Sequence, residues 1–443
     1  NRLYKKIFEE YIKFLIQKGY PISFYIEGTR SRTGQLLKPR TGMLSSIHQA
    51  YIEKKAKDIL FVPIYIGYDQ ILEGVSFLKE LRGEKKEQES FRGFFRARSV
   101  LRKQTGNCYV NIGIPFKISD YIRKNRVAST YSKVECNNIA IESMVRINQA
   151  CVVTPIALFS TILLSSPNRS LNKILLLEIY TKFYSILELC KYDENIILPE
   201  KRSVSAFSHI QKHSPVKGFS SHSHDIIYID EKSTDLLKFH KNNIIHLFAV
   251  SSVISRIFEY NYEMTQESLL DQCVFFYQFL NKQLFLKWEE DKSCIVFKEQ
   301  LSVLVKLGLL LKNKEDDKIK KPHINTAEYF ILKLVGKVAS IYLQIYSLFI
   351  LELGISVNKE KLDIELFRKN CLNTVDRFNS LNGEDIDNQL FDRSYQGFIS
   401  VMIKMQVIES SNNYFCINAN NFRTIEKFAL NIVSYDTKMS FKI

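Results

Sequence analysis

The sequence predicts an α/β core, built as a βαβ-like sheet flanked by helices, followed by a mainly α-helical C-terminal region. Two observations lead to this fold class. Short β-branched and apolar runs alternate with helical runs near the N-terminus, whereas from Ser129 onward long runs with helical periodicity dominate. Hydrophobic residues make up 46% of the 443 residues, so apolar burial does not limit folding and two or three domains are expected.

The expected elements of the core follow one another in a regular order. Helices are predicted over residues 1–18, 42–55 and 91–103. Strands are predicted over residues 22–26, 59–65 and 109–114. The second strand is expected to be buried because it is apolar and rich in β-branched residues. Strands that alternate with a helix in this way form a βαβ-like unit.

Helical periodicity continues through the rest of the chain. The predicted helices cover residues 135–165, 171–191, 236–260, 265–286, 326–353, 364–381 and 396–406. Residues 201–225 are rich in serine and histidine and have little periodicity, so they are interpreted as a linker. The charged run 312–322 is interpreted as a second break. The predicted domains are residues 1–128, 129–311 and 312–443.

The chain carries a formal net charge of +15, which implies an acidic partner: nucleic acid, an anionic membrane surface or a charged metabolite. Its 8 cysteines are scattered without a C-x-x-C pair, which argues against zinc ribbons and a disulfide framework and fits a reducing compartment. His222, His224 and Asp225 lie close together but lack a fourth ligand, so no metal site is predicted.

The best candidate for a membrane span is the uncharged window at residues 147–168. It contains several polar residues, among them Asn148, Gln149 and Thr154, whereas a span needs ~20 predominantly apolar residues. We therefore expect a buried or interfacial helix in this window and a core helix over residues 341–357. Membrane association is expected to be peripheral.

A loop at residues 27–40, called the basic loop below, follows the first predicted strand. Its basic side chains are Arg30, Arg32, Lys38 and Arg40. No acidic side chain occurs between Gly28 and Ile52, so this charge is not compensated locally. Arginine binds phosphate oxygens through two parallel hydrogen bonds, and glycines let the backbone approach a ligand. The loop therefore predicts a phosphate site; the alternative is a surface turn with solvated arginines.

The same residues carry a family resemblance. The run EGTRSRTG at residues 27–34, followed by VPIYIGY at residues 62–68, resembles the third and fourth sequence blocks of the glycerolipid acyltransferases. The later runs KELRGEKKEQES, GNCYVNIGIPF, MVRINQA, KNNIIH and LFLKW are similar to the bacterial membrane-bound glycerol-3-phosphate 1-O-acyltransferases. The resemblance implies that residues 1–128 are the C-terminal part of an acyltransferase domain.

The resemblance implies transfer of a fatty acyl group to the sn-1 hydroxyl of glycerol 3-phosphate, giving lysophosphatidic acid. The donor would be acyl-CoA or acyl-carrier protein, without a further cofactor. The location implied is the cytoplasmic face of the bacterial inner membrane, in peripheral contact with anionic phospholipids.

In this family the general base belongs to a His-x-x-x-x-Asp block upstream of the EGTR block. None of the 8 histidines here has an aspartate five positions later. The chain is therefore expected to be roughly the C-terminal half of a longer enzyme, with no catalytic residue and no activity of its own.

The resemblance also implies a set of substrate-binding residues. They are Glu27, Gly28, Thr29, Arg30, Ser31, Arg32, Lys38, Pro63 and Arg82. Arg30 and Arg32 are expected to pair with the substrate phosphate. Thr29 and Ser31 either donate hydrogen bonds to phosphate or cap the turn. Glu27 either fixes the arginines and accepts a hydrogen bond from a substrate hydroxyl, or is a buried ion-pair anchor.

The remaining residues have less specific expected roles. Lys38 either contacts phosphate or coenzyme A, or is solvated. Pro63 is expected to shape a strand end near the site, and Arg82 is a family-matching charge for which a site role is expected. His48 is not a candidate base, because nothing in the sequence places an acid to orient it, and His246 is expected to be structural.

Three alternatives remain open at this point. A dihydroxyacetone-phosphate acyltransferase shares the EGTRSR-type block, although the bacterial-type flanking runs argue against it. A nucleic-acid-binding protein would fit the charge, but no zinc, RRM or KH signature is found, so nucleic acid is not an expected partner. A non-catalytic scaffold would fit a protein that lacks the His-Asp block. No oligomeric state is predicted.

Overall fold

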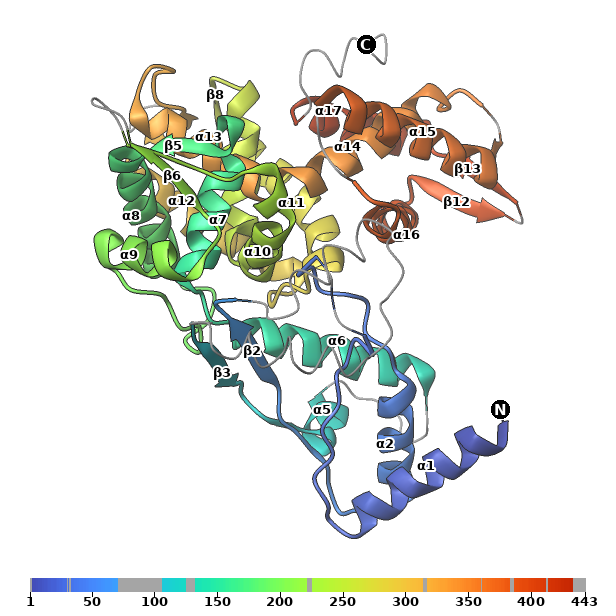
Figure 1. Ribbon diagram of the computed structural model, residues 1–443. Helices are drawn as coiled ribbons and strands as arrows, with labels where there is room; N and C mark the ends of the chain where they lie inside the picture. Colours follow the sequence, from blue (N-terminus) through green and yellow to red (C-terminus); the bar gives the residue numbers. More distant parts are fainter. Residues whose placement is uncertain are drawn as a thin grey trace. The chain divides into compact units, whose positions relative to one another are not determined.

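The computed structural model divides the chain into two compact units, each mainly helical (Figure 1). The described residues are 2–29, 31, 33–70, 106–124, 132–220, 225–313, 317–359, 361–382, 386–411 and 413–432. The first unit comprises Asn1–Leu164, Asn168–Thr181 and Lys191–Ile244. The second comprises Ser165–Pro167, Lys182–Cys190 and Ile245–Ile443. The predicted domain boundaries at residues 128 and 311 stay predictions.

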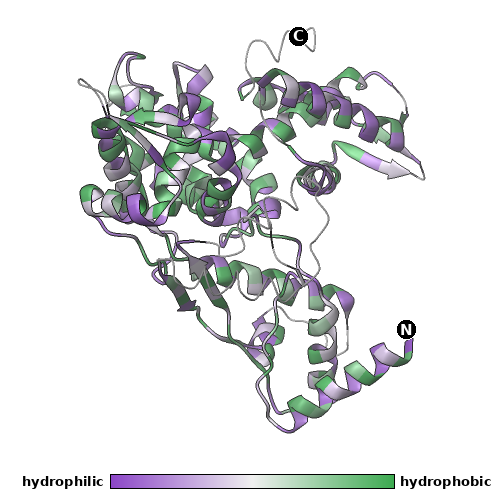
Figure 2. Ribbon diagram, viewed as in Figure 1, coloured by the Kyte–Doolittle hydropathy of each residue, from purple (hydrophilic) through white to green (hydrophobic). Residues whose placement is uncertain are grey.

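Among the described residues, the N-terminal part of the first unit is built on four helices, and the sequence predicted all of them except the short one at residues 118–124. They are α1 (Arg2–Gln17), α2 (Gly42–Ile52), α5 (Ile118–Lys124) and α6 (Lys133–Gln149). Polar and apolar residues alternate along α1 with a helical period (Figure 2). It ends because Gly19 adopts a φ of 74°, which lets the Tyr20 N–H return to the Leu15 carbonyl at 3.0 Å. The predicted helices over residues 1–18 and 42–55 are thus confirmed, whereas the predicted helix 91–103 lies outside the described residues.

Short antiparallel strand pairs replace the βαβ-like unit. The strands are β1 (Leu60–Phe61), β2 (Ile64–Tyr68), β3 (Cys108–Ile112) and β4 (Phe116–Lys117). β2 pairs with β3 from Ile64↔Ile112 to Tyr68↔Cys108, and β1 pairs with β4. Because the ladders between these strands are antiparallel, the described residues contain no βαβ-like sheet. The predicted strand over residues 109–114 is confirmed as β3.

Of the other two strand predictions, one is wrong and one is confirmed only in part. Residues 22–26 form no ladder with another described segment; they run in an irregular conformation, and Phe24 and Ile26 pack against the core around Leu44. The predicted strand 59–65 is interrupted at Pro63, which lacks an N–H for the ladder. It is not buried either, since Ile64 is 45% exposed. The apolar character of β2 and β3 is visible in Figure 2.

The predicted helix 135–165 is two helices, α6 and α7 (Pro155–Ser165). The break precedes Pro155, and Thr154 supports the new start by accepting a hydrogen bond from the Ala157 N–H at 3.1 Å. Nearly all side chains of α7 are buried. The expectation of a buried helix within residues 147–168 is therefore confirmed.

The segment predicted as a linker is folded. Residues 201–225 contain α9 (Ser203–His213), β6 (Lys217–Ser220) and the start of β7 (Asp225–Tyr228). With β5 (Ser170–Asn172) these strands form a three-stranded sheet in the order β5-β7-β6. Phe207 of α9 packs edge-on against Phe159 of α7, with ring centroids 5.9 Å apart. The linker prediction is wrong: α9 and β6 lie within the segment, β6 pairs with the neighbouring β7, and only β5, the other partner of β7, lies far upstream.

Helices α8 (Lys173–Leu189) and α10 (Glu231–Tyr260) contribute residues to both units, and the other C-terminal helices belong to the second. These are α11 (Gln266–Leu284), α12 (Ser293–Lys306), α13 (Ala327–Val338), α14 (Ser340–Ile355), α15 (Ile364–Asn382), α16 (Asn388–Lys404) and α17 (Ala419–Leu430). Two 3-10 turns are η1 (Pro167–Arg169) and η2 (Glu290–Lys292). The sequence predicted this helical character, although 326–353 is two helices.

Two small sheets complete the second unit. Their strands are β8 (Glu263–Thr265), β9 (Leu311–Lys312), β10 (Lys318–Lys320), β11 (Leu362–Asp363), β12 (Ile408–Ser411) and β13 (Tyr414–Ile417), in the orders β8-β10-β9 and β11-β13-β12. The run predicted as a second break therefore contains paired strands. Stacked rings such as Phe279 and Tyr346, with centroids 4.5 Å apart, fill the core.

Among the described residues, no single helix has both the length and the apolar composition that a membrane crossing needs. α13 and α14 meet these criteria only as a pair, and they are bent by 67° where they join. α14 is buried along most of its length, as predicted for residues 341–357.

Candidate functional site

The basic loop is closed at its base by backbone hydrogen bonds. The Arg40 N–H donates to the Ile26 carbonyl at 2.8 Å, which brings the two ends of the loop together. Glu27 adds a second cross-link, because its Oε2 accepts the Leu37 N–H at 2.9 Å. Glu27 thus connects the beginning of the loop to its second half, a role that the sequence did not specify.

The tip of the basic loop has its own internal turn. The Ser31 hydroxyl donates to the Gln35 carbonyl at 2.6 Å, and the Gln35 N–H donates to Thr33 Oγ1 at 3.4 Å. Ser31 therefore stabilises the turn, which is one of the two roles expected for it. These bonds hold the tip in one conformation without using the side chains of Thr29 or Lys38, both of which are exposed.

Two glycines of the basic loop have left-handed backbone conformations. Gly28 has a φ of 67°, and a Cβ there would lie 2.7 Å from Cδ of Arg40, whose side chain runs alongside. Gly34 has a φ of 75° and is buried. A Cβ on Gly34 would collide with the backbone of Phe239 in α10. Side chains at either position would therefore strain the loop.

The tip also contacts α10 through a hydrogen bond. Nδ2 of Asn242 donates to the Thr33 carbonyl at 2.8 Å. Together with the close approach of Gly34 to Phe239, this bond holds the tip of the basic loop against the part of α10 that belongs to the first unit.

Several predicted site residues can be placed, and others cannot. Pro63 is buried, and its carbonyl accepts the Gly113 N–H at 2.8 Å, so it separates β1 from β2 while keeping β3 aligned. Arg30, Arg32 and Arg82 lie outside the described residues. The substrate-binding roles of all the predicted residues stay predictions.

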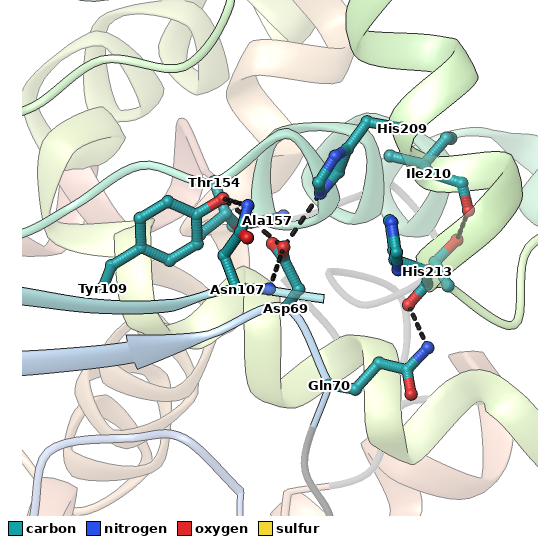
Figure 3. Close-up of polar contacts among 10 residues, drawn as sticks. Asp69, Gln70, Asn107, Tyr109, Thr154, Ala157, His209, Ile210 and His213 are labelled. Carbon is teal, nitrogen blue, oxygen red and sulfur yellow. Dashed lines mark hydrogen bonds and ion pairs between the residues drawn. The ribbon is translucent and has the colours of Figure 1, made fainter. Parts of the chain in front are cut away.

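A buried carboxylate that the sequence did not single out lies directly after β2. Asp69 accepts the Asn107 N–H at 2.9 Å and the Tyr109 hydroxyl at 3.4 Å, and its Oδ2 lies 2.9 Å from Nε2 of His209 (Figure 3). The side chain of Asp69 is 0% exposed and that of His209 24%. We call Asp69, Asn107, Tyr109 and His209 the Asp69 cluster.

The Asp69 cluster joins the β2–β3 pair to α9. A second link runs beside it, because Gln70 Nε2 donates to the His213 carbonyl at 2.9 Å (Figure 3). The rings of His209 and His213 lie 4.7 Å apart. The only sequence signal for this cluster was an acidic residue at the end of an apolar strand, and its histidine partner fell in the segment interpreted as a linker.

His240 connects the Asp69 cluster electrostatically to the helix that holds the basic loop. It is 3% exposed, and burial lowers its pKa to about 4, although the negative charge of Asp69 acts in the opposite direction. His240 follows Phe239, which contacts Gly34. This stretch of α10 therefore contacts the tip of the basic loop and lies within electrostatic reach of Asp69.

The low pKa of His240 predicts acid destabilisation. The unfolded state, with an ordinary histidine pKa of 6.5, binds a proton between pH 6.5 and pH 4 that the folded state does not bind. The free energy of unfolding should thus fall as the pH falls through this window, by up to about 3 kcal/mol. Urea unfolding at several pH values should show a smaller fall in His240→Gln; an unchanged dependence on pH would contradict the assignment.

His48 has an acidic neighbour, contrary to the sequence-based expectation. Its Nε2 lies 3.5 Å from Oε2 of Glu135, and its Nδ1 lies 3.5 Å from Sγ of Cys136. Burial lowers the pKa of His48 and raises that of Glu135, and both changes favour a neutral pair. His48 is only 1% exposed, so this cluster belongs to the core between α2 and α6. His246 is buried too, at 3% exposure, in agreement with a structural role.

No group of three or more potential metal-binding side chains occurs in the part of the chain that the structure describes. The candidate site is the basic loop, held by α10, with the Asp69 cluster supporting the end of β2. The sequence of the loop is suited to an anion, because it carries four basic residues and no acidic residue after Glu27.

Comparisons with known proteins assign both parts of this site to families. A family model described as acyltransferase matches residues 1–67, and one described as glycerol-3-phosphate acyltransferase C-terminal region matches residues 77–411. The basic loop lies in the first match, whereas α9 and α10 lie in the second.

Curated relatives named glycerol-3-phosphate acyltransferase match most of this chain. The glycerol-3-phosphate acyltransferase of Pseudomonas putida (strain W619) is 28% identical over 425 residues, covering 93% of this chain and 51% of the relative. That of Pseudomonas aeruginosa (strain UCBPP-PA14) is 28% identical over 420 residues, covering 92% and 50%. The chain therefore spans about half the length of the curated relatives that it matches.

Proposed function

Because the chain belongs to the glycerol-3-phosphate acyltransferase C-terminal region family, we propose that it forms part of an enzyme that acylates the sn-1 hydroxyl of glycerol 3-phosphate. The product would be lysophosphatidic acid. The donor, acyl-CoA or acyl-carrier protein, is part of this proposal, as is a peripheral location on the cytoplasmic face of the bacterial inner membrane, in contact with anionic phospholipids.

The observation that carries the proposal is the construction of the basic loop. Its base is cross-linked by Glu27, its tip is held by Asn242, and no acidic residue occurs between residues 28 and 52. A loop that is held at its base and at its tip loses little conformational entropy when it binds an anion. Less of the free energy of phosphate binding is therefore spent on ordering the loop.

In the proposed mechanism the basic loop positions glycerol 3-phosphate and does not activate its hydroxyl. Holding the phosphate of glycerol 3-phosphate places its hydroxyl for attack on the thioester carbonyl, which converts an encounter of two molecules into a reaction within one complex. The carbon–oxygen bond forms, the carbon–sulfur bond breaks, and the hydroxyl proton passes to a base. The resemblance places that base in the His-Asp block, which this chain lacks.

The test is acylation of glycerol 3-phosphate by the full-length protein, with Arg30→Ala and Arg32→Ala beside the wild type. Loss of one charge-assisted contact to phosphate should raise the acceptor KM by roughly 10- to 100-fold. Lys57→Ala, which removes a positive charge from the exposed turn after α2, is the matched control and should behave as wild type.

The same assay separates the alternatives. Activity that is unaffected by both arginine substitutions would place the phosphate site elsewhere, and preferential use of dihydroxyacetone phosphate would change the substrate assignment. A full-length wild type with an intact His-Asp block and no activity would refute the enzyme proposal and favour a non-catalytic scaffold.

We also propose that the first unit supplies the C-terminal part of an α/β acyltransferase core. The match to residues 1–67 supports this, as does one apolar face of the β2–β3 pair: Ile64 and Ile66 are 45% and 43% exposed, and Val110 and Ile112 are 60% and 62% exposed. Such a face is suited to packing against further elements. A structure of the full-length protein in which this face stays open to solvent would contradict the proposal.

A further inference from the structure

We infer that α10 positions the basic loop for phosphate binding, with Asn242 as the positioning residue. This inference rests on the proposed function, and it gives a role to the KNNIIH run, which the sequence singled out without explaining it. It also links the two family matches, since the loop lies within residues 1–67 and Asn242 within residues 77–411.

The first argument is the contact that Asn242 makes. Its side-chain amide donates to the Thr33 carbonyl at 2.8 Å, across 209 positions of sequence. Thr33 directly follows Arg32 in the sequence, within the internal turn closed by Ser31 and Gln35. Fixing the Thr33 carbonyl therefore fixes the peptide bond between Thr33 and Gly34, one residue beyond one of the two proposed phosphate-binding arginines.

The second argument is that the tip packs directly on the backbone of α10. Gly34 packs so closely on Phe239 that a Cβ could not be added without moving the backbone. Phe239 and Asn242 are three positions apart in a helix, so they lie on the same face. One steric contact and one hydrogen bond from the same face define both the distance and the orientation of the tip.

The third argument is that this part of α10 is itself held in place. Leu237 and Ile244 are fully buried, each at 0% exposure. At the helix start, the Ser233 N–H donates to Asp230 Oδ1 at 3.0 Å, and Asp230 in turn pairs with Lys217 at 2.6 Å. A support of this kind can transmit its geometry to the loop, whereas a mobile helix could not.

Acceptor kinetics of the full-length protein provide the test. Asn242→Ala should raise the KM for glycerol 3-phosphate by about 5- to 30-fold, the effect of losing one positioning hydrogen bond, with the donor KM unchanged. Asn242→Asp keeps the size of the side chain but has no amide donor and adds a negative charge, so its acceptor KM should rise further. Asn243→Ala, one position along the same helix, is the matched control and should leave the acceptor KM unchanged.

A merely structural role for Asn242 predicts a different pattern. It would lower the melting temperature and the amount of active enzyme, but leave the acceptor KM of the surviving enzyme as in wild type. An unchanged acceptor KM in both Asn242 variants, with a raised KM in Arg30→Ala, would therefore overturn this inference and leave the proposed function standing.

A second readout separates this inference from the proposed function. If the wild type does not acylate glycerol 3-phosphate, calorimetric titration with inorganic phosphate still tests the support of the loop. Weaker phosphate binding by Asn242→Ala than by Asn243→Ala would uphold it, and equal binding would overturn it.

Discussion

Replacing Asp69 by alanine is expected to lower the free energy of unfolding by about 3–5 kcal/mol. Its carboxylate is fully buried and accepts hydrogen bonds from the Asn107 N–H and the Tyr109 hydroxyl, with His209 2.9 Å away. Alanine would leave these groups without their acceptor in a site that water reaches poorly, and it would remove one of the two described links between the β2–β3 region and α9. Urea unfolding of wild type and variant measures the difference.

Two further variants make this result interpretable. Asp120→Ala removes an exposed carboxylate that pairs with Arg123 on the surface of α5, so it should cost no more than about 1 kcal/mol. Asp69→Asn retains one oxygen acceptor and the size of the side chain. Its loss in the free energy of unfolding should therefore lie between those of Asp69→Ala and Asp120→Ala. A loss under about 0.5 kcal/mol in Asp69→Ala would show that the cluster contributes no net stability.

Replacing Gly34 by alanine is expected to raise the KM for glycerol 3-phosphate in the full-length protein by about 10- to 100-fold. The new Cβ would collide with the Phe239 backbone, and the φ of 75° is unfavourable for any residue with a side chain. Since α10 is held in place by buried residues on its other face, such as Leu237 and Ile244, the loop would move rather than the helix. The phosphate site would then lose its geometry. Initial rates at varied acceptor concentration measure the effect.

Gly42→Ala is the matched control for this substitution. Gly42 begins α2, and a Cβ there would meet nothing within 4 Å, so alanine should be tolerated or slightly stabilising. If Gly34→Ala had the same KM as Gly42→Ala, the tip of the basic loop would not need its contact with α10 for acceptor binding.

Much of the helical fold could be predicted from the sequence, because helix formation depends on residues three and four positions apart. The helices over residues 1–18 and 42–55 were predicted for this reason, and so was the buried helix within residues 147–168. Breaks before Pro155 and at Ala339 were missed, since apolar periodicity continues across both. The basic loop was recognised for a similar reason: its charges and glycines are contiguous in the sequence.

Strand predictions were less successful, because a strand is defined by a partner that local sequence does not reveal. Residues 22–26 are apolar, yet they have no ladder partner among the described residues. Conversely, β7 begins at the last residue of the segment interpreted as a linker, and it pairs with β5. Pro63 further divides a run that composition alone presents as one strand.

The sequence by itself therefore determined most of the helices, the basic loop and the family to which the chain belongs. Only the tertiary structure decided what supports the loop and what lies beside it. Asp69 meets His209 across 140 positions, and Asn242 meets Thr33 across 209. The physical reason is that a hydrogen bond depends on distance in space, and periodicity along a chain carries no information about which distant segments the folded core brings together.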